Sequence, residues 1–150
     1  MNSVEMRKIY MDFHFVVDFD DVDYARVVYF GRYYTYAEKA EAHMLRQFGL
    51  SNKILCEEYN IGTPIVFSQC HYYQPARLED QLVVKIQLHD LSEKGFSIHF
   101  EIYKEGNDSK LVSGKTDHRF ININNFKSTR IPEDLYTKFS QIQKEVNNQW

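Results

Sequence analysis

Apolar and polar residues alternate near the start of the chain. Between Ile9 and Phe19, polar residues such as Asp12, His14 and Asp18 separate apolar ones. The apolar positions on one face are Met11, Phe13, Phe15, Val17 and Phe19. Because successive side chains of a strand point to opposite faces, this period of two predicts a β-strand.

The pattern then changes to that of a long helix. From Phe30 to Phe48 the apolar residues lie three or four positions apart. They are Tyr33, Ala37, Ala40, Met44 and Phe48. Gly49 follows, and glycine commonly ends a helix because it adopts the left-handed conformation without strain. The spacing predicts one central helix of about five turns.

The second half of the chain alternates short apolar segments with turn material. After a stretch expected to be a connection, four segments are typical of strands: Pro64–Tyr73, Gln81–Leu88, Phe96–Tyr103 and Leu111–Ile123. Ile131, Leu135, Phe139, Ile142 and Val146 then return to helical spacing, with Pro132 suited to a first helical position. A helix followed by strands with short connections predicts an antiparallel sheet with the helix on one face, an α+β fold.

Length and composition limit the possible classes of protein. We expect 150 residues to form a single domain over 1–150, and a hydrophobic share of 43% excludes a disordered chain. A net charge of −3 gives no electrostatic reason to expect nucleic-acid binding. The first eight residues lack the apolar core of a signal peptide, and no apolar run is long enough to span a bilayer. We therefore expect a cytoplasmic protein without integral membrane association.

Cysteine and histidine spacing indicates no metal or disulfide framework. Cys56 and Cys70 are not in C-x-x-C spacing, and the six histidines show no ligand spacing such as H-E-x-x-H. We expect no metal site, bystander thiols, and histidines in core or surface roles.

The candidate chemistry lies between the first strand and the central helix. Asp21-Val22-Asp23 places carboxylates beside a helix N-terminus. Unpaired amides there can stabilise a developing oxyanion, and a carboxylate can attack a carbonyl or activate a water. A carboxylate and unpaired amides are the least that acyl transfer requires, although Asp residues also favour turns and helix caps.

This segment resembles a known signature, D-x-D-x-x-G-[VI]-V-[YW]-x-x-x-Y, of hotdog-fold acyl-CoA thioesterases of the 4-hydroxybenzoyl-CoA thioesterase type. The matching residues are Asp21, Asp23, Val27, Val28, Tyr29 and Tyr33, and Arg26 stands where the family has Gly. Later segments are similar in the same order: Gly62–Val66, Tyr73–Asp80 and Arg130–Glu133. The resemblance spans about Val16 to Leu135 and implies a curved antiparallel sheet wrapped around the long helix.

The resemblance also implies an activity. It assigns the catalytic role to Asp23, as nucleophile or general base, and leaves Asp20 and Asp21 structural. The main-chain amides of Tyr29, Phe30 and Gly31 are the candidates to polarise the thioester oxygen. The expected substrate is an acyl-CoA, with no cofactor, and a homodimer or homotetramer is expected because the family builds its sites between subunits.

Three further residues are candidates for substrate binding. Tyr33 belongs to an aromatic cluster that suits an acyl pocket or simple helix packing; the other members are Tyr29, Phe30, Tyr34 and Tyr36. Arg26 suits a ligand phosphate or carboxylate, or solvent. Lys94 lies in a predicted turn where the family contacts the nucleotide end of coenzyme A, and is otherwise a solvated lysine.

Other functions stay open at this point. Hotdog dehydratases and hydratases carry a different motif, with a His near the helix start or R-x-x-x-x-H, and neither occurs around Asp23. An acyl carrier protein thioesterase and a non-catalytic acyl-CoA binding protein remain alternatives. The second is raised by Phe30, where the family often has Tyr or His, and by Arg26.

Overall fold

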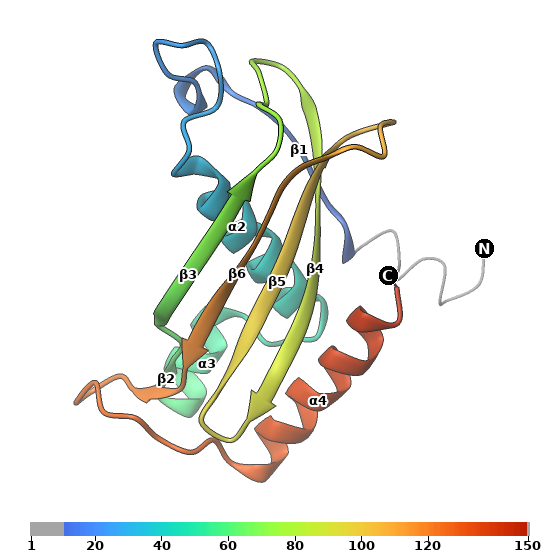
Figure 1. Ribbon diagram of the computed structural model, residues 1–150. Coiled ribbons are helices and arrows are strands. Elements are labelled where there is room, and N and C mark those ends of the chain that lie inside the picture. Colours follow the sequence, from blue (N-terminus) through green and yellow to red (C-terminus); the bar gives the residue numbers. More distant parts are fainter. Residues whose placement is uncertain (1–10, 150) are drawn as a thin grey trace.

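The computed structural model describes residues 11–149. A five-stranded antiparallel sheet, in the order β1-β4-β5-β6-β3, curves around helix α2 (Figure 1). The strands are β1 (Phe13–Val16), β3 (Ile65–Tyr72), β4 (Gln81–Ser92), β5 (Gly95–Lys104) and β6 (Lys110–Arg119), with β2 (Ile61–Gly62) and β7 (Ile121–Asn122) forming a separate pair. The helices are η1 (Phe19–Asp21), α2 (Arg32–Gln47), α3 (Asn52–Tyr59) and α4 (Glu133–Asn147). This arrangement confirms the predicted α+β hotdog fold.

The core lies between α2, α4 and one face of the sheet. Alternate residues of the central strands, such as Val84 of β4 and Ile98 of β5, are buried there beneath Ala40 and Met44 of α2. Each large apolar side chain buried in this way contributes roughly 1.5–3 kcal/mol to the free energy of unfolding. The alternation that predicted the strands therefore reflects this single covered face.

The first predicted strand is longer than the observed one. β1 ends at Val16, and Phe19 is 83% exposed in the short 3-10 helix η1. The chain turns because the Asp18 amide donates to Asp21 Oδ2 at 2.9 Å. Ile9 and Tyr10, the predicted beginning of this strand, lie outside the described residues.

The central helix starts two residues later than predicted and ends one residue earlier, at Gln47, with Phe48 as its C-cap. Gly31 is its N-cap, so Phe30 precedes the helix. At the other end Gly49 has φ +72°, and the Leu50 amide donates to Leu45 O at 2.9 Å. This left-handed glycine confirms the predicted C-terminal stop.

Helix α3 was not predicted. Ser51 Oγ accepts the Ile54 amide at 3.1 Å at its start, and Asn60, with φ +58°, ends it. Only Leu55 of this helix is buried, so eight residues leave almost no periodic pattern to detect.

The predicted strand Leu111–Ile123 is wrong in one respect. It breaks at Phe120, whose amide donates to Lys94 O, and the residues that follow form β7, which pairs with β2.

Helix α4 closes the core beside β4. Its apolar residues are buried, and the Phe139 ring lies 5.4 Å from that of Phe96. Pro132 is the N-cap, one position before the predicted one. The Asn147 side chain bonds both the amide and the carbonyl of Leu88, at 3.0 and 2.9 Å, where β1 no longer covers the edge of β4. Within residues 11–149, no helix has the length and apolar character needed to cross a membrane.

Strand β3 forms an open edge with apolar side chains. Among residues 11–149, only β6 pairs with it. Several of its residues and the one that follows are about half exposed: Ile65, Val66, Phe67, Tyr72 and Tyr73. An unpaired edge with exposed apolar side chains is typical of a surface that another chain covers.

Candidate active site

A tight loop between η1 and α2 carries Asp23. Val22 and Val28 form an isolated antiparallel bridge that closes the loop, and the Asp23 amide donates to Val27 O at 2.9 Å. The Asp23 side chain is exposed, and its Oδ1 accepts the Ala25 amide at 2.8 Å. The carboxylate is thus oriented by its own turn while its other oxygen stays available.

Arg26 stands at the strained position of this loop. It has φ +66°, the left-handed region in which a side chain costs roughly 1–2 kcal/mol relative to glycine. This conformation explains why the family signature has Gly at the position of Arg26. The Arg26 side chain is exposed at the surface of the loop.

The three candidate amides differ in what they already contact. The Tyr29 amide donates to Asp21 O at 2.9 Å, so it is not available to a ligand. The amides of Phe30 and Gly31 donate to no acceptor among residues 11–149. Because both lie at the N-terminal end of α2, where the helix dipole favours negative charge, these two remain the oxyanion candidates.

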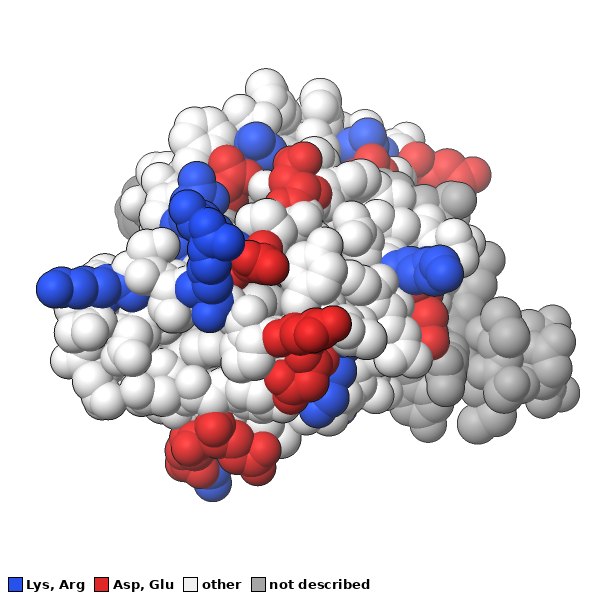
Figure 2. Space-filling model, turned by 90° about the horizontal axis from the view of Figure 1, so that it is seen from below, with Lys and Arg blue, Asp and Glu red and all other residues white. Residues whose placement is uncertain are grey.

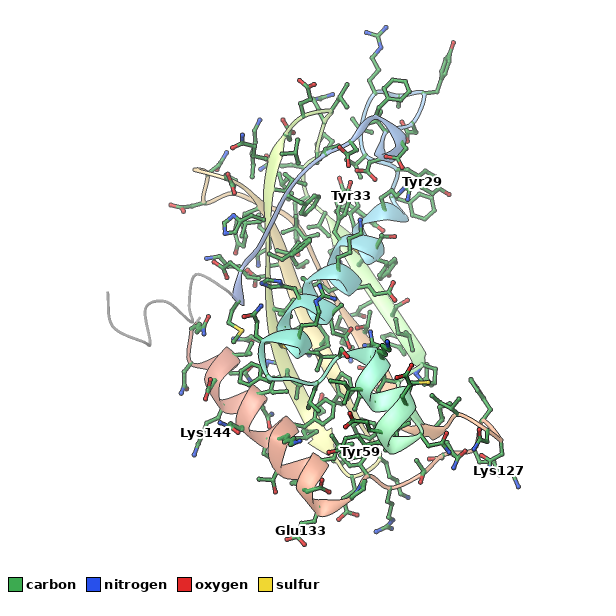
Figure 3. The ribbon with its side chains drawn as sticks, turned by 180° about the vertical axis from the view of Figure 1, so that it is seen from behind. Tyr29, Tyr33, Tyr59, Lys127, Glu133 and Lys144 are labelled. Atoms are coloured by element: carbon green, nitrogen blue, oxygen red, sulfur yellow. The ribbon has the colours of Figure 1, made fainter. Side chains whose placement is uncertain are left out.

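An aromatic hollow of about 300 Å3 lies beside these amides. It is lined by Val27, Val28, Phe30, Tyr33, Tyr72, Tyr73, Gln74 and Pro75. Tyr33 is only 3% exposed, and its hydroxyl accepts the Ala76 amide at 3.2 Å. Figure 3 shows Tyr29 and Tyr33 at the same end of α2, far from α4 and its Lys144. Tyr33 therefore forms part of the wall of the hollow, and its hydroxyl is already hydrogen-bonded to the main chain.

Tyr72 is a site residue that the sequence did not reveal. Its hydroxyl donates to Phe30 O at 3.1 Å, and its ring lies 5.6 Å from that of Tyr33. The contact joins β3 to the helix start across 42 residues of sequence. No local pattern signals a contact between positions so far apart.

Asp21 has a structural role. It is buried, its Oδ2 accepts the Asp18 amide, and its Oδ1 lies 3.7 Å from Arg32 Nε. Asp18, Asp20 and Asp21 bring one carboxyl oxygen each within 4.8 Å of one another. The turn accounts for this acidic cluster, because Asp21 caps it and the other two side chains are exposed.

Lys94 lies at the opposite end of the protomer from Asp23. It occupies the turn between β4 and β5, at the bottom of Figure 1, whereas the Asp23 loop is at the top. Figure 2 shows acidic and basic side chains interspersed on the face seen from below. Glu93, next to Lys94 in the chain, pairs with Arg130 at 3.1 Å. One protomer therefore does not bring Lys94 and Asp23 into a common site.

A buried acid and histidine form a second polar cluster that the sequence did not indicate. Glu41 of α2 is 8% exposed, and its Oε2 lies 3.6 Å from His118 Nε2 of β6. His118 Nδ1 donates to Thr63 O at 2.9 Å, which leaves Nε2 facing Thr116 Oγ1 and Glu41. Burial, with the nearby Glu38 carboxylate, raises the pKa of Glu41 to about 8, and burial lowers the pKa of His118.

Glu41→Gln is expected to stabilise the protein increasingly as pH rises from 5 to 8. In this window the folded protein keeps the Glu41 proton, while the unfolded chain, with a carboxyl pKa near 4.5, has released it, so Glu41 lowers wild-type stability as pH rises. Gln carries no such proton, and we expect a gain of at least about 1 kcal/mol at pH 8 relative to pH 5. Urea unfolding at both pH values measures it.

Glu38→Gln, an exposed neighbour on the same helix, is the matched control and should leave most of the pH dependence in place. Parallel stability curves for wild type and Glu41→Gln would show that Glu41 ionises normally.

Comparison with known proteins finds similar proteins over most of the chain. The chain matches the thioesterase-like superfamily over residues 17–139. It is 28% identical over 114 residues to a 1,4-dihydroxy-2-naphthoyl-CoA hydrolase of Crocosphaera subtropica, covering 76% of this chain and 82% of that protein. A protein of the same name from Thermosynechococcus vestitus is 25% identical over 148 residues, covering 99% and 98%.

A solved structure agrees with the fold. The structure of a gentisyl-coenzyme A thioesterase superposes with a TM-score of 0.75 at 27% identity, covering 85% of this chain and 98% of that one. The superfamily match extends from the residue after β1 into α4 and includes the Asp23 loop and the start of α2. The chain therefore belongs to the thioesterase-like superfamily.

Proposed function

We propose that the protein is an acyl-CoA thioesterase that hydrolyses its substrate to a free acid and coenzyme A. The observation that carries the proposal is the pairing of an exposed carboxylate, Asp23, with two unpaired amides at the start of α2, in a chain of this superfamily. Thioester hydrolysis requires a nucleophile or base and a place for the oxyanion. The loop and the helix supply both.

The reaction would proceed through a tetrahedral oxyanion. The Asp23 carboxylate attacks the thioester carbonyl, or removes a proton from a water that does so. The Phe30 and Gly31 amides donate to the oxygen as it gains charge. Collapse of the intermediate breaks the C–S bond, and the thiolate of coenzyme A leaves. If Asp23 is the nucleophile, water then hydrolyses the acyl anhydride on Asp23 and releases the free acid. If Asp23 is the general base, the free acid forms directly and the proton on Asp23 passes to the thiolate.

We further propose that the acyl group is aromatic. The hollow beside the amides is lined by the rings of Phe30, Tyr33, Tyr72 and Tyr73, and such rings favour stacked or edge-on aromatic partners. The named relatives act on dihydroxynaphthoyl-CoA and gentisyl-CoA. Arg26, and Lys94 from a neighbouring subunit, would then meet the phosphates of coenzyme A.

A thiol-release assay tests the proposal. Purified protein is incubated with aromatic and straight-chain acyl-CoAs and a thiol-reactive dye. We expect release to be fastest with an aromatic acyl group. Saturable binding without release would support the non-catalytic binding protein, and release only from an acyl carrier protein conjugate would support the alternative enzyme.

The protein is expected to be a dimer or larger in solution. A second copy that pairs with β3 would satisfy its free backbone groups and cover its exposed apolar side chains. Sedimentation equilibrium should therefore give a mass of at least twice the 17.9 kDa chain. An active monomer would contradict this expectation.

A further inference from the structure

The two unpaired amides at the start of α2 belong to peptide groups whose carbonyl oxygens both accept hydrogen bonds. Tyr29 O, in the same peptide as the Phe30 amide, accepts the Arg32 amide at 2.9 Å. Phe30 O, in the same peptide as the Gly31 amide, accepts the Tyr72 hydroxyl at 3.1 Å. The first peptide is therefore fixed by a local turn, and the second by one side chain from β3.

A hydrogen bond to a carbonyl oxygen also affects the amide of the same peptide group. It draws electron density toward the oxygen and strengthens the N–H as a donor, by about 10–30%. It also fixes the plane of the peptide, and a donor already oriented needs no reorganisation when the oxyanion forms. The contact that Tyr72 makes is thus of the kind that prepares an oxyanion donor.

The surroundings keep Tyr72 in this role. Its ring contacts those of Tyr33 and Phe30, with centroids 5.6 and 6.5 Å away. Burial, with the nearby Cys70 thiol, raises the pKa of the Tyr72 hydroxyl above its ordinary value. The hydroxyl therefore remains protonated, and able to donate, throughout the neutral range.

We propose that Tyr72 is a positioning residue for thioester hydrolysis, which orients and strengthens the Gly31 amide as an oxyanion donor through its hydrogen bond to Phe30 O. This inference rests on the proposed function. It adds the edge strand β3 to the groups that form the site, although Tyr72 donates to the main chain and not to the reacting atoms.

Tyr72→Phe tests the proposal, because it keeps the ring and removes only the hydroxyl. Tyr59→Phe is the matched control: it removes a hydroxyl that donates to Asp134 Oδ2 at 3.2 Å, and Tyr59 does not line the hollow. We expect Tyr72→Phe to lower kcat roughly five- to tenfold with KM changed less than about twofold, since the interaction acts in the transition state. Tyr59→Phe should leave kcat within about twofold.

A spectroscopic measurement separates positioning from a merely structural effect. The slow Asp23→Asn variant is saturated with an aromatic acyl-CoA, and the infrared band of the bound thioester carbonyl is recorded with Tyr72 and with Phe at this position. Stronger hydrogen bonding lowers the stretching frequency, so the band should shift to higher frequency when the hydroxyl is lost.

The outcomes distinguish this inference from the proposed function. A wild-type protein without turnover overturns the function and this inference with it. An active wild type with an equally active Tyr72→Phe variant overturns the inference alone. So does an unshifted carbonyl band, or a loss of kcat matched by a fall in thermal stability that Tyr59→Phe shares.

Discussion

Replacing Asp23 by asparagine is expected to lower acyl-CoA turnover at least about a hundredfold, because general-base or nucleophilic assistance contributes that much or more. The loop should keep its structure, since an asparagine oxygen can still accept the Ala25 amide that Asp23 Oδ1 accepts at 2.8 Å. The measurement is steady-state thiol release with the preferred substrate, together with thermal unfolding.

Asp20→Asn is the matched control for this variant. Asp20 is an exposed acid three residues earlier, and its loss should change turnover less than about threefold because it contacts neither loop amides nor the hollow. An Asp23→Asn protein that retains activity within a few-fold would move the catalytic carboxylate elsewhere in the chain.

Phe30→Pro is expected to abolish most of the activity, while Phe30→Tyr should remain active. Proline has no N–H, and loss of one oxyanion donor costs about 3 kcal/mol of barrier, roughly a hundredfold or more in kcat. Phe30 is 60% exposed and precedes the first helical residue, so a proline ring can be accommodated there. Tyrosine keeps the amide and adds only a hydroxyl.

Circular dichroism and thermal unfolding must show that the proline variant folds, because an unfolded protein would also be inactive. A folded Phe30→Pro variant with near-normal kcat would place the oxyanion on other donors. Inactivity of both Phe30 variants would instead indicate that packing of the phenyl ring controls the site.

The sequence predicted the elements that bury one long face. Strands β3 to β6 and helices α2 and α4 each cover many residues with a regular apolar period, so their existence and order could be inferred. The ends of the elements were predicted less accurately. β1 stops before a turn made by Asp18 and Asp21, and α2 begins only after its N-cap, Gly31. Helix α3 was not predicted because it buries a single residue.

The candidate site was only partly predictable, because its contacts join distant segments. The motif located Asp23 and the helix start, but it could not show that the Tyr29 amide is already bonded to Asp21 O. The Tyr72 contact with Phe30 spans 42 residues, and the cluster of Glu41 and His118 joins α2 to β6. Such pairings depend on how the sheet curves around the helix, which no local spacing encodes.

Thioester hydrolysis by this protein is tested most directly by the mass balance of products from one aromatic acyl-CoA incubated with the wild-type protein. Free acid and coenzyme A are quantified together by liquid chromatography and mass spectrometry. We expect equal amounts of the two products, reaching many equivalents per subunit and absent with Asp23→Asn. Products that never exceed one equivalent per subunit, or that form equally with Asp23→Asn, would contradict it.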